Sequence, residues 1–441
     1  MKRGVRILLA VLCFLLLTGC YSFDSDDFYS PPKRSEQYRD LQQAVETAMR
    51  GGSYSAPVSG SNRQAIQQVD LDGDGQDEAL VFCKIEAERP LKLFIFKRIE
   101  NKYSLICTLE GDGTAFDSVQ YVQIDGRPGQ EILLSRRIGE QVQQFLSVYT
   151  LKDNVAAELL STGYYAYTTM DVDGDQLTDI FVLRANSEGP RAFAELYHYK
   201  NEELQKDAEA SLSTAADSVK RILTGNVAKD VPAVFVASAY DESNLITDVF
   251  ALENGRFSNI TQNDESGQSS QTVRNYYVYS TDIDNDGLIE MPNTLPLAAE
   301  EGNETSQGQY RIVWYNLSVD GTRTEKMTTY HNYGEGWFLF LPESWCAELS
   351  VDKVFLSGGV SGTRFSTLTE DGTRTELLTV YAFTGENAQA MSEQDGRILL
   401  TQRGDVCYAA LCGPGCELSL EELQARFSFI SLDLLPNEGQ K

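Results

Sequence analysis

The chain has 441 residues, with 65 Asp and Glu against 37 Lys and Arg, so its formal net charge is −28. So large an acidic excess excludes a nucleic-acid partner, because phosphates are bound by clustered Lys and Arg. It also argues against docking on anionic lipid through a basic patch.

The first residues have the features of an export signal. Three positive residues precede an unbroken apolar run over residues 7–17, which is too short to anchor a mature protein across a bilayer. The Leu-Thr-Gly-Cys20 that follows resembles the signal of bacterial lipoproteins, in which the Cys thiol is lipidated; the alternative is an ordinary secretory peptide. We expect residues 1–19 to be removed and Cys20 to carry the lipid. The protein would then be extracytoplasmic and lipid-anchored to the bacterial cell membrane.

Two short segments precede the main part of the chain. Residues 20–34 are rich in Ser, Asp and Pro without an apolar period, which predicts a flexible tether. Residues 35–61 are predicted to form an N-terminal helix and lead-in. The helix begins after a Ser35 cap, has its apolar stripe on one face and ends at the glycine pair 51–52.

Three acidic loops stand out in the next part of the chain. Each places acids at positions 1, 3, 5 and 9, and the backbone carbonyl of position 7 would add a further oxygen ligand. An oxygen-only set with several carboxylates is typical of Ca²⁺ rather than of Mg²⁺, zinc or copper. We therefore expect up to three structural Ca²⁺ ions. The predicted ligands are Asp70, Asp72, Asp74, Gln76 and Glu78; Asp171, Asp173, Asp175, Leu177 and Asp179; and Asp282, Asp284, Asp286, Leu288 and Glu290.

The loops recur within a longer repeat over residues 62–335. Repeat units start at Asp70, Gln123, Asp171, Thr224 and Asp282, each with four strand-like runs, and a period of about 50 residues indicates propeller blades. Units two and four are degenerate. Unit two has Arg127 at position 5, which puts a cation where a metal would bind, and unit four has no carboxylate at all. Both are expected to be turns without metal.

Repeats of this length with Asp-x-Asp-x-Asp-Gly-x-x-Asp/Glu loops resemble the FG-GAP and VCBS repeats of integrin-alpha-type propellers. The resemblance covers residues 62–335 and implies a Ca²⁺-stabilised β-propeller, although such propellers usually carry seven blades and this chain shows five. Gln176 occupies position 6, where the other loops have Gly75 and Gly287. A residue other than Gly is costly there if φ is positive.

The repeat is lost after residue 335. Strand-like runs with helical segments at 386–393 and 419–427 predict a separate α+β domain over residues 336–441, to which we assign no activity. The expected fold class is therefore mainly β, with a propeller-like domain of about five four-stranded units followed by a smaller α+β domain.

No catalytic motif is recognisable. The two histidines, His198 and His331, have no nucleophile motif beside them, and no phosphate loop or dinucleotide fingerprint occurs. We expect a monomeric, non-catalytic lipoprotein whose propeller is a binding or scaffold module for protein or glycan. The alternative is an extracytoplasmic hydrolase acting on surface polymers, which a deep polar pocket holding carboxylates outside the loops would favour.

Overall fold

The computed structural model describes residues 36–139, 144–275, 278–356, 360–369 and 371–430. The predicted signal peptide, the tether with Cys20, and the Ser35 cap lie outside these ranges. None of the described helices is long and apolar enough to cross a membrane.

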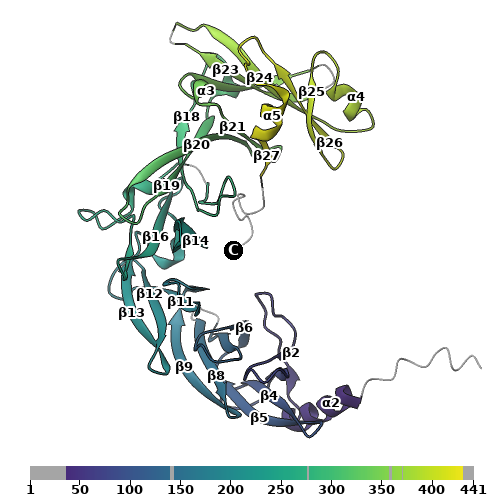
Figure 1. Ribbon diagram of the computed structural model, residues 1–441, viewed down its shortest axis with the longest axis vertical. Coiled ribbons are helices and arrows are strands. Elements are labelled where there is room, and N and C mark those ends of the chain that lie inside the picture. The colour runs from purple at the N-terminus through teal and green to yellow at the C-terminus, as the bar shows by residue number, and fades with distance from the viewer. Residues whose placement is uncertain (1–35, 140–143, 276–277, 357–359, 370, 431–441) are drawn as a thin grey trace, which may run out of the picture.

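The described chain is mainly β and contains six antiparallel sheets. Five of them follow one another in chain order along an arc, with the sixth at the C-terminal end (Figure 1). This arrangement confirms the predicted fold class of propeller-like four-stranded repeats.

The first three sheets match the predicted repeat plan, in which each strand pairs with the next along the chain. A two-residue strand, β1 (Ser53–Tyr54), also pairs with β3 of the first sheet. The strands of sheet one are β2 (Ile66–Val69), β3 (Glu78–Lys84), β4 (Leu91–Ile99) and β5 (Lys102–Gly111); of sheet two, β6 (Ala115–Val122), β7 (Glu131–Arg137), β8 (Gln144–Lys152) and β9 (Val155–Tyr164); of sheet three, β10 (Ala166–Met170), β11 (Asp179–Arg184), β12 (Phe193–Lys200) and β13 (Glu203–Ser211).

Sheet four keeps the plan, whereas sheet five departs from it. The first strand of sheet five is reduced to a bridge between Thr281 and Glu290. Two strands are added at the far edge, where β21 pairs with β20 and also with β27 near the end of the described chain. The strands of sheet four are β14 (Val219–Ala228), β15 (Val231–Ala239), β16 (Leu245–Glu253) and β17 (Arg256–Asn259); of sheet five, β18 (Met291–Pro296), β19 (Tyr310–Leu317), β20 (Arg323–Asn332), β21 (Trp337–Phe340) and β27 (Phe427–Phe429).

These added strands correct the predicted domain boundary at residue 336. Residues 337–340 form β21 and therefore belong to the fifth sheet, and β27 brings the end of the C-terminal part back to the same sheet. The sequence pattern does not reveal this extension, because β21 and β27 carry none of the acidic-loop motif by which the repeat is recognised.

The sixth sheet and its helices form the C-terminal part. The helix α5 begins with a capping box in which Ser419 and Glu422 bond each other's backbone, as predicted. Its strands, in order across the sheet, are β22 (Leu349–Phe355), β23 (Ser361–Leu368), β24 (Arg374–Phe383), β26 (Val406–Cys412) and β25 (Ile398–Arg403). The helices are α3 (Glu343–Cys346), α4 (Ala388–Ser392) and α5 (Leu420–Arg426), and short 3-10 turns occur at η2 (Ala216–Ser218), η3 (Ser270–Thr272) and η4 (Glu304–Ser306).

Apolar contacts between neighbouring sheets hold the row together. The central strands are buried on both faces, as in β3, where six consecutive residues from Glu78 are buried. Phe82 of sheet one meets Phe116 of sheet two edge to face, with ring centroids 5.2 Å apart. Phe181 of sheet three packs on Phe250 of sheet four in a tilted arrangement, with ring centroids 5.3 Å apart. Each sheet therefore completes the core of the next.

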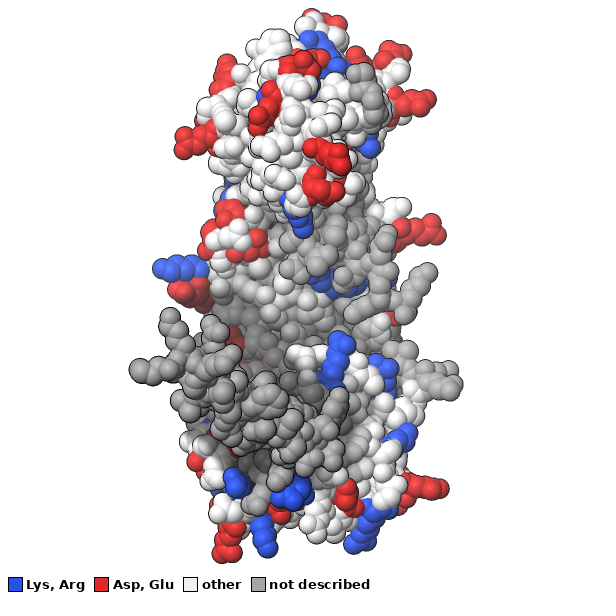
Figure 2. Space-filling model, turned by 90° about the vertical axis from the view of Figure 1, so that its right-hand side faces the viewer, with Lys and Arg blue, Asp and Glu red and all other residues white. Residues whose placement is uncertain are grey.

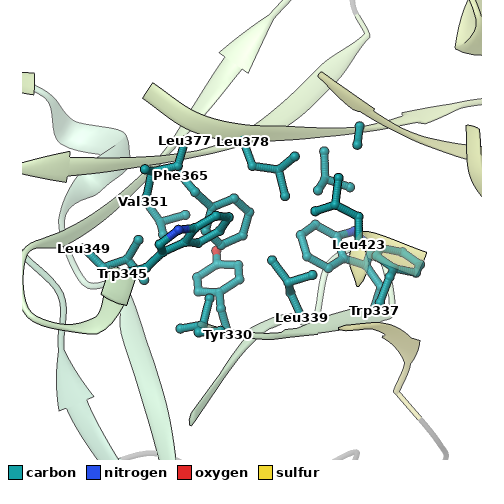
Figure 3. Packing of buried hydrophobic residues seen from close by; sticks show 14 of the residues in the cluster. Tyr330, Trp337, Leu339, Trp345, Leu349, Val351, Phe365, Leu377, Leu378 and Leu423 are labelled. Carbon is teal, nitrogen blue, oxygen red and sulfur yellow. The ribbon is translucent and has the colours of Figure 1, made fainter. Parts of the chain in front are cut away.

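Each end of the row is covered by a different element. The helix α2 (Glu36–Met49) lays Leu41, Val45 and Met49 on the outer face of sheet one. At the other end, Trp337 and Leu339 of β21 pack into the core of the sixth sheet (Figure 3). Because a helix and not a further sheet covers sheet one, the described sheets form an open arc and not a closed ring.

Candidate functional site

The three acidic loops link the first and second strands of sheets one, three and five. In each loop the carboxylates at positions 1, 3 and 9 converge, with one oxygen from each lying within 4.8 Å of the others. These three clusters could hold a metal ion, as the spacing of the acids predicted. The converging residues are Asp70, Asp72 and Glu78; Asp171, Asp173 and Asp179; and Asp282, Asp284 and Glu290.

The remaining predicted ligands are not part of the converging groups. Each position-5 carboxylate accepts a hydrogen bond from the backbone N–H of position 7. This bond measures 2.8 Å from Gln76 to Asp74, 2.8 Å from Leu177 to Asp175 and 2.9 Å from Leu288 to Asp286. Positions 5 and 7 thus form a tight turn beside each cluster.

The acids also shape the loop backbone. Asp70 accepts from the backbone N–H groups of Gly73 at 2.7 Å and Gly75 at 2.9 Å, so its two oxygens fold the loop around themselves. At position 9, Glu78 accepts from the N–H of Leu71 at 2.9 Å. The equivalent bonds occur at Asp171 and Asp179 in the loop at 171–179. In the loop at 282–290, Glu290 accepts from the N–H of Ile283, and Asp282 accepts from the N–H groups of Asp286 and Gly287.

The degenerate loop of sheet two keeps this shape. Glu131 accepts from the N–H of Ile124 at 2.7 Å, as position 9 does elsewhere. Arg127 pairs with Asp125 at 2.5 Å, which confirms the cation predicted at position 5. The loop fold therefore does not depend on an acid at position 1, where Gln123 stands.

An ammonium group lies inside the first loop. Lys97 extends from β4, and its Nζ contacts Asp72, Asp74 at 2.8 Å and Glu78 at 3.4 Å. Burial alone would lower the pKa of Lys97, but hydrogen bonds to Asp72 and Asp74 and the charge of Glu78 raise that pKa above its ordinary value. Lys97 is thus held charged among three carboxylates.

A second ammonium occupies the loop of sheet five. The Nζ of Lys326, on β20, lies 2.8 Å from Asp284, 2.5 Å from Asp286 and 2.9 Å from Glu290. The hydrogen bond to Lys326 is the main cause that lowers the pKa of Asp286. Neither lysine is recognisable from the loop motif, because both lie on later strands outside it.

The loop of sheet three holds an imidazole instead. His198 of β12 places Nδ1 2.7 Å from Asp179 and 3.9 Å from Asp173, and its Nε2 lies 3.8 Å from Asp207. The hydrogen bond to Asp179 is the main cause that raises the pKa of His198. Burial, followed by the charges of Asp179 and Asp175, raises the pKa of Asp173. The carboxylates of this loop are therefore less well compensated.

The three loops consequently differ in how well they fit a metal ion. The loop at 171–179 offers oxygen donors with no ammonium among them, which suits a hard divalent cation. In the loops at 70–78 and 282–290, an ammonium lies within bonding distance of the carboxylates that would coordinate an ion. An ion would bind these two loops only by displacing the ammonium from the carboxylates of positions 3 and 9.

The loops also join neighbouring sheets. The backbone N–H of Thr178 bonds the carbonyl of Gln123 at 2.8 Å, and that of Ile289 bonds Asn226 at 2.8 Å. A Cβ added at Gly129 would lie 2.3 Å from the carbonyl oxygen of Leu71, so the first two loops touch backbone to backbone. Their acids and bases line an open pocket of about 390 Å³.

Neither histidine takes part in a nucleophile–base pair among the described residues. His198 contacts only carboxylates, as given above. His331 is buried between Trp314 and Phe338, with ring centroids 6.1 and 5.0 Å away, and its Nδ1 lies 3.2 Å from the hydroxyl of Tyr333. Both are held by the fold and face no Ser or Cys nucleophile.

Comparisons with known proteins identify no family. No family model matches, and no curated protein matches. Among solved structures, the rhamnogalacturonan lyase YesW is 12% identical with a TM-score of 0.30, covering 71% of this chain and 60% of the lyase. Sqt1 from Chaetomium thermophilum is 8% identical with a TM-score of 0.31, covering 75% of this chain and 82% of Sqt1. The chain thus matches less than two thirds of the length of YesW.

Proposed function

We propose that this chain is an extracytoplasmic lipoprotein, anchored by lipid on Cys20, whose row of sheets is a non-catalytic binding or scaffold module for a protein or glycan. The curvature of the row carries the proposal. In Figure 1 the first strands, such as β6 and β14, lie on the inner side of the arc, and the last strands, such as β9 and β13, lie on the outer side. Curved repeat proteins use such extended concave surfaces for binding.

Polar side chains of the first strands link the sheets along this inner side. The Tyr121 hydroxyl donates to Gln67 of sheet one at 2.6 Å. The Tyr167 hydroxyl of sheet three lies 3.2 Å from that of Ser118 and accepts from the Gln120 amide at 3.4 Å. Tyr side chains such as Tyr121 and Tyr167 are enriched at protein–protein interfaces.

The distribution of charge fits the same interpretation. Figure 2 looks onto the open side of the arc, where acidic side chains gather mainly at the margins and the upper end. The described surface between them is mostly uncharged, with Lys and Arg over the lower part. A partner that contacts the described surface between the margins would therefore meet few acidic side chains.

We further propose that Ca²⁺ binds the loop at 171–179, where Asp171, Asp173 and Asp179 converge beside Asp175 and the Leu177 carbonyl. The ion would neutralise these carboxylates and brace the junction of β10 and β11. Stability would then rise with Ca²⁺ concentration by mass action.

One observation bears on the hydrolase alternative. An open pocket of about 750 Å³ beside β12 and β13 holds Glu188 and Glu209, two carboxylates outside the loops. Both residues are exposed. A general acid for glycoside cleavage is normally withdrawn from water to keep its proton, so this pocket supports catalysis weakly.

Binding and cleavage are separated by one experiment. The protein is run in native gels cast with surface polysaccharides, and the same mixtures are analysed for new reducing ends or unsaturated products. Retarded migration without new ends, weakened by Tyr167→Ala but not by Glu209→Gln, is expected. Polymer cleavage that Glu209→Gln abolishes would establish the hydrolase instead. Membrane fractionation of Cys20→Ala, which is expected to move to the soluble fraction, tests the anchor separately.

A further inference from the structure

We infer that Lys97 and Lys326 are built-in counter-cations that take the place of a metal ion in the loops at 70–78 and 282–290. Only the loop at 171–179 among the three is then left to take Ca²⁺. The inference refines the calcium part of the proposed function, and its test separates the two.

Each lysine contacts two of the three carboxylates that an ion would use. Its Nζ meets the carboxylates of positions 3 and 9, which belong to the converging group, and also the carboxylate of position 5. A divalent ion bound to the same oxygens would lie within a few ångströms of the ammonium, where two like charges repel strongly. The ammonium and the ion therefore exclude each other.

The two lysines reach equivalent points from different strands. Lys97 lies on the third strand of its sheet, next to the Ala79–Phe96 pair and hence opposite Glu78. Lys326 lies on β20, which is the fourth strand of its sheet when the Thr281–Glu290 bridge is counted as the first. It occupies the bulge opposite Trp314 and Tyr315. In the degenerate loop, Arg127 supplies the cation from within the loop itself. Three separate positions thus supply a positive group to the same kind of loop.

Sheet three has no lysine at the two strand positions that correspond to Lys97 and Lys326. The third-strand position, next to the Ile180–Tyr197 pair, holds His198. The fourth-strand bulge, opposite Leu196 and Tyr197, holds Asp207 in place of a lysine. The ammonium of Lys200 pairs with Asp207 at 3.0 Å, and among the described residues it forms no ion pair with a loop carboxylate. Of the three acidic loops, the loop at 171–179 is the one that has no ammonium among the described residues, and it has the carboxylate of Asp207 nearby.

Removal of an ammonium should open a metal site. Lys326 hydrogen-bonds all three of its carboxylates, whereas Lys97 leaves Asp72 Oδ1 and Glu78 Oε1 buried without a hydrogen-bond partner among the described residues. Without Lys97 or Lys326, three converging carboxylates face one another with nothing to compensate them. A divalent cation then becomes the available counter-charge.

The test counts Ca²⁺ ions bound per full chain by equilibrium dialysis at millimolar Ca²⁺. We expect one ion for the wild type, one more for each of Lys97→Met and Lys326→Met, and two more for the double variant. The extra ions should also raise the melting temperature of these variants above its value in EDTA. Lys92→Met is the matched control on β4, because Lys92 pairs only with Glu110, and it should bind as the wild type does.

Three ions bound by the wild type would overturn the inference, and so would folded lysine variants that bind no additional ion. Lys97→Arg keeps the positive charge and should gain no site. A wild type that binds no ion, with ions gained in the lysine variants, would uphold the role of the lysines and refute the calcium proposal for residues 171–179. If a lysine variant folds only with Ca²⁺, the ion has replaced the ammonium. If the lysine variants fold neither with nor without Ca²⁺, the number of ions bound by the wild type decides. One ion or none supports the inference, and three ions contradict it.

Discussion

At position 6, each acidic loop needs a left-handed backbone. The φ angle is +83° at Gly75 and +89° at Gly287, where Gly adopts it without strain. Gln176 has φ of +70° at the same position. A side chain with a Cβ pays roughly 1 kcal/mol for this conformation. The strain anticipated from the sequence of this loop is therefore present.

Gln176→Gly is expected to stabilise the protein by about 1 kcal/mol, because it relieves the left-handed strain at an exposed position. The midpoint of urea unfolding should rise. Gly75→Ala is the matched reverse change, since a Cβ there meets nothing within 4 Å and only the backbone is affected. An unchanged midpoint for Gln176→Gly would show that the Gln side chain offsets its own strain.

The buried His331 links stability to pH. Its Nε2 has no hydrogen-bond partner among the described residues, and burial lowers its pKa to about 3 from an ordinary value of 6.5. The unfolded chain therefore binds a proton between pH 6.5 and 3 that the folded chain does not. Stability from this group is present above pH 6.5 and is lost as the pH falls through that window.

We expect proton uptake by His331 in the unfolded chain to lower the unfolding free energy of the wild type as the pH drops below 6. The loss should be up to about 1.4 kcal/mol per pH unit. In His331→Phe this contribution disappears, because Phe cannot take up a proton. The measurement is the difference in unfolding free energy between variant and wild type from pH 7.5 to 4.5. A difference that stays constant across this range would contradict the assignment.

At the scale of single residues, the sequence predicted which acids converge but not which cationic side chains contact them. The spacing 1, 3, 5 and 9 predicted the convergence of Asp70, Asp72 and Glu78 because a short loop fixes its own geometry. Lys97 and Lys326 are placed beside the loops by the pairing of their strands, and Lys326 also by a β-bulge. Such long-range placement depends on register, which no local motif encodes.

Among the elements, α2 acts as the cover of the first sheet. Sheets one to four were recognisable from the sequence because each repeats the pattern of a strand, a loop and three further strands. The helix was recognisable from its apolar stripe, and its place at the end of the row follows from where it occurs in the chain. The strands β21 and β27 were not assigned to sheet five, since pairing between distant segments leaves no periodic trace.

Val45→Ala is expected to lower the unfolding free energy by about 2 kcal/mol. Val45 of α2 is fully buried against the first sheet, so its truncation removes apolar contacts between the helix and that sheet. Chemical denaturation followed by circular dichroism measures the loss. Gln43→Ala, on the exposed face of the same helix, should change stability by less than about 0.5 kcal/mol. Equal effects from the two changes would mean that α2 does not pack as described.

For the whole molecule, the return of β27 to β21 fastens the sixth sheet to the fifth. Phe427 places its ring 5.4 Å from that of Trp337 and 5.5 Å from that of Tyr408, and so contacts both sheets. The two sheets share one core, which includes Trp337, Leu339, Phe365 and Leu423.

Phe427→Ala is expected to cost about 3 kcal/mol or more and to destabilise both sheets together. Tryptophan fluorescence follows the change, since Trp314 and Trp337 lie in sheet five and Trp345 lies in α3 and packs into the shared core. Phe355→Ala removes an exposed Phe of the sixth sheet, 69% accessible, and should be close to neutral. Two separate transitions in Phe427→Ala, one for each sheet, would show that the sheets fold independently.

The helix that covers the first sheet has a consequence for how such a chain can change its length. A ring of blades must close, so its number of blades is set by geometry, and a gain or loss of one blade strains every contact. A row with a cover at each end meets no such condition. A duplicated unit inserted between two sheets would meet the same kinds of neighbour as the units beside it and would lengthen the concave side by one sheet. The reach of this molecule toward a partner can therefore vary by whole units, while the helix at one end and the sixth sheet at the other stay the same.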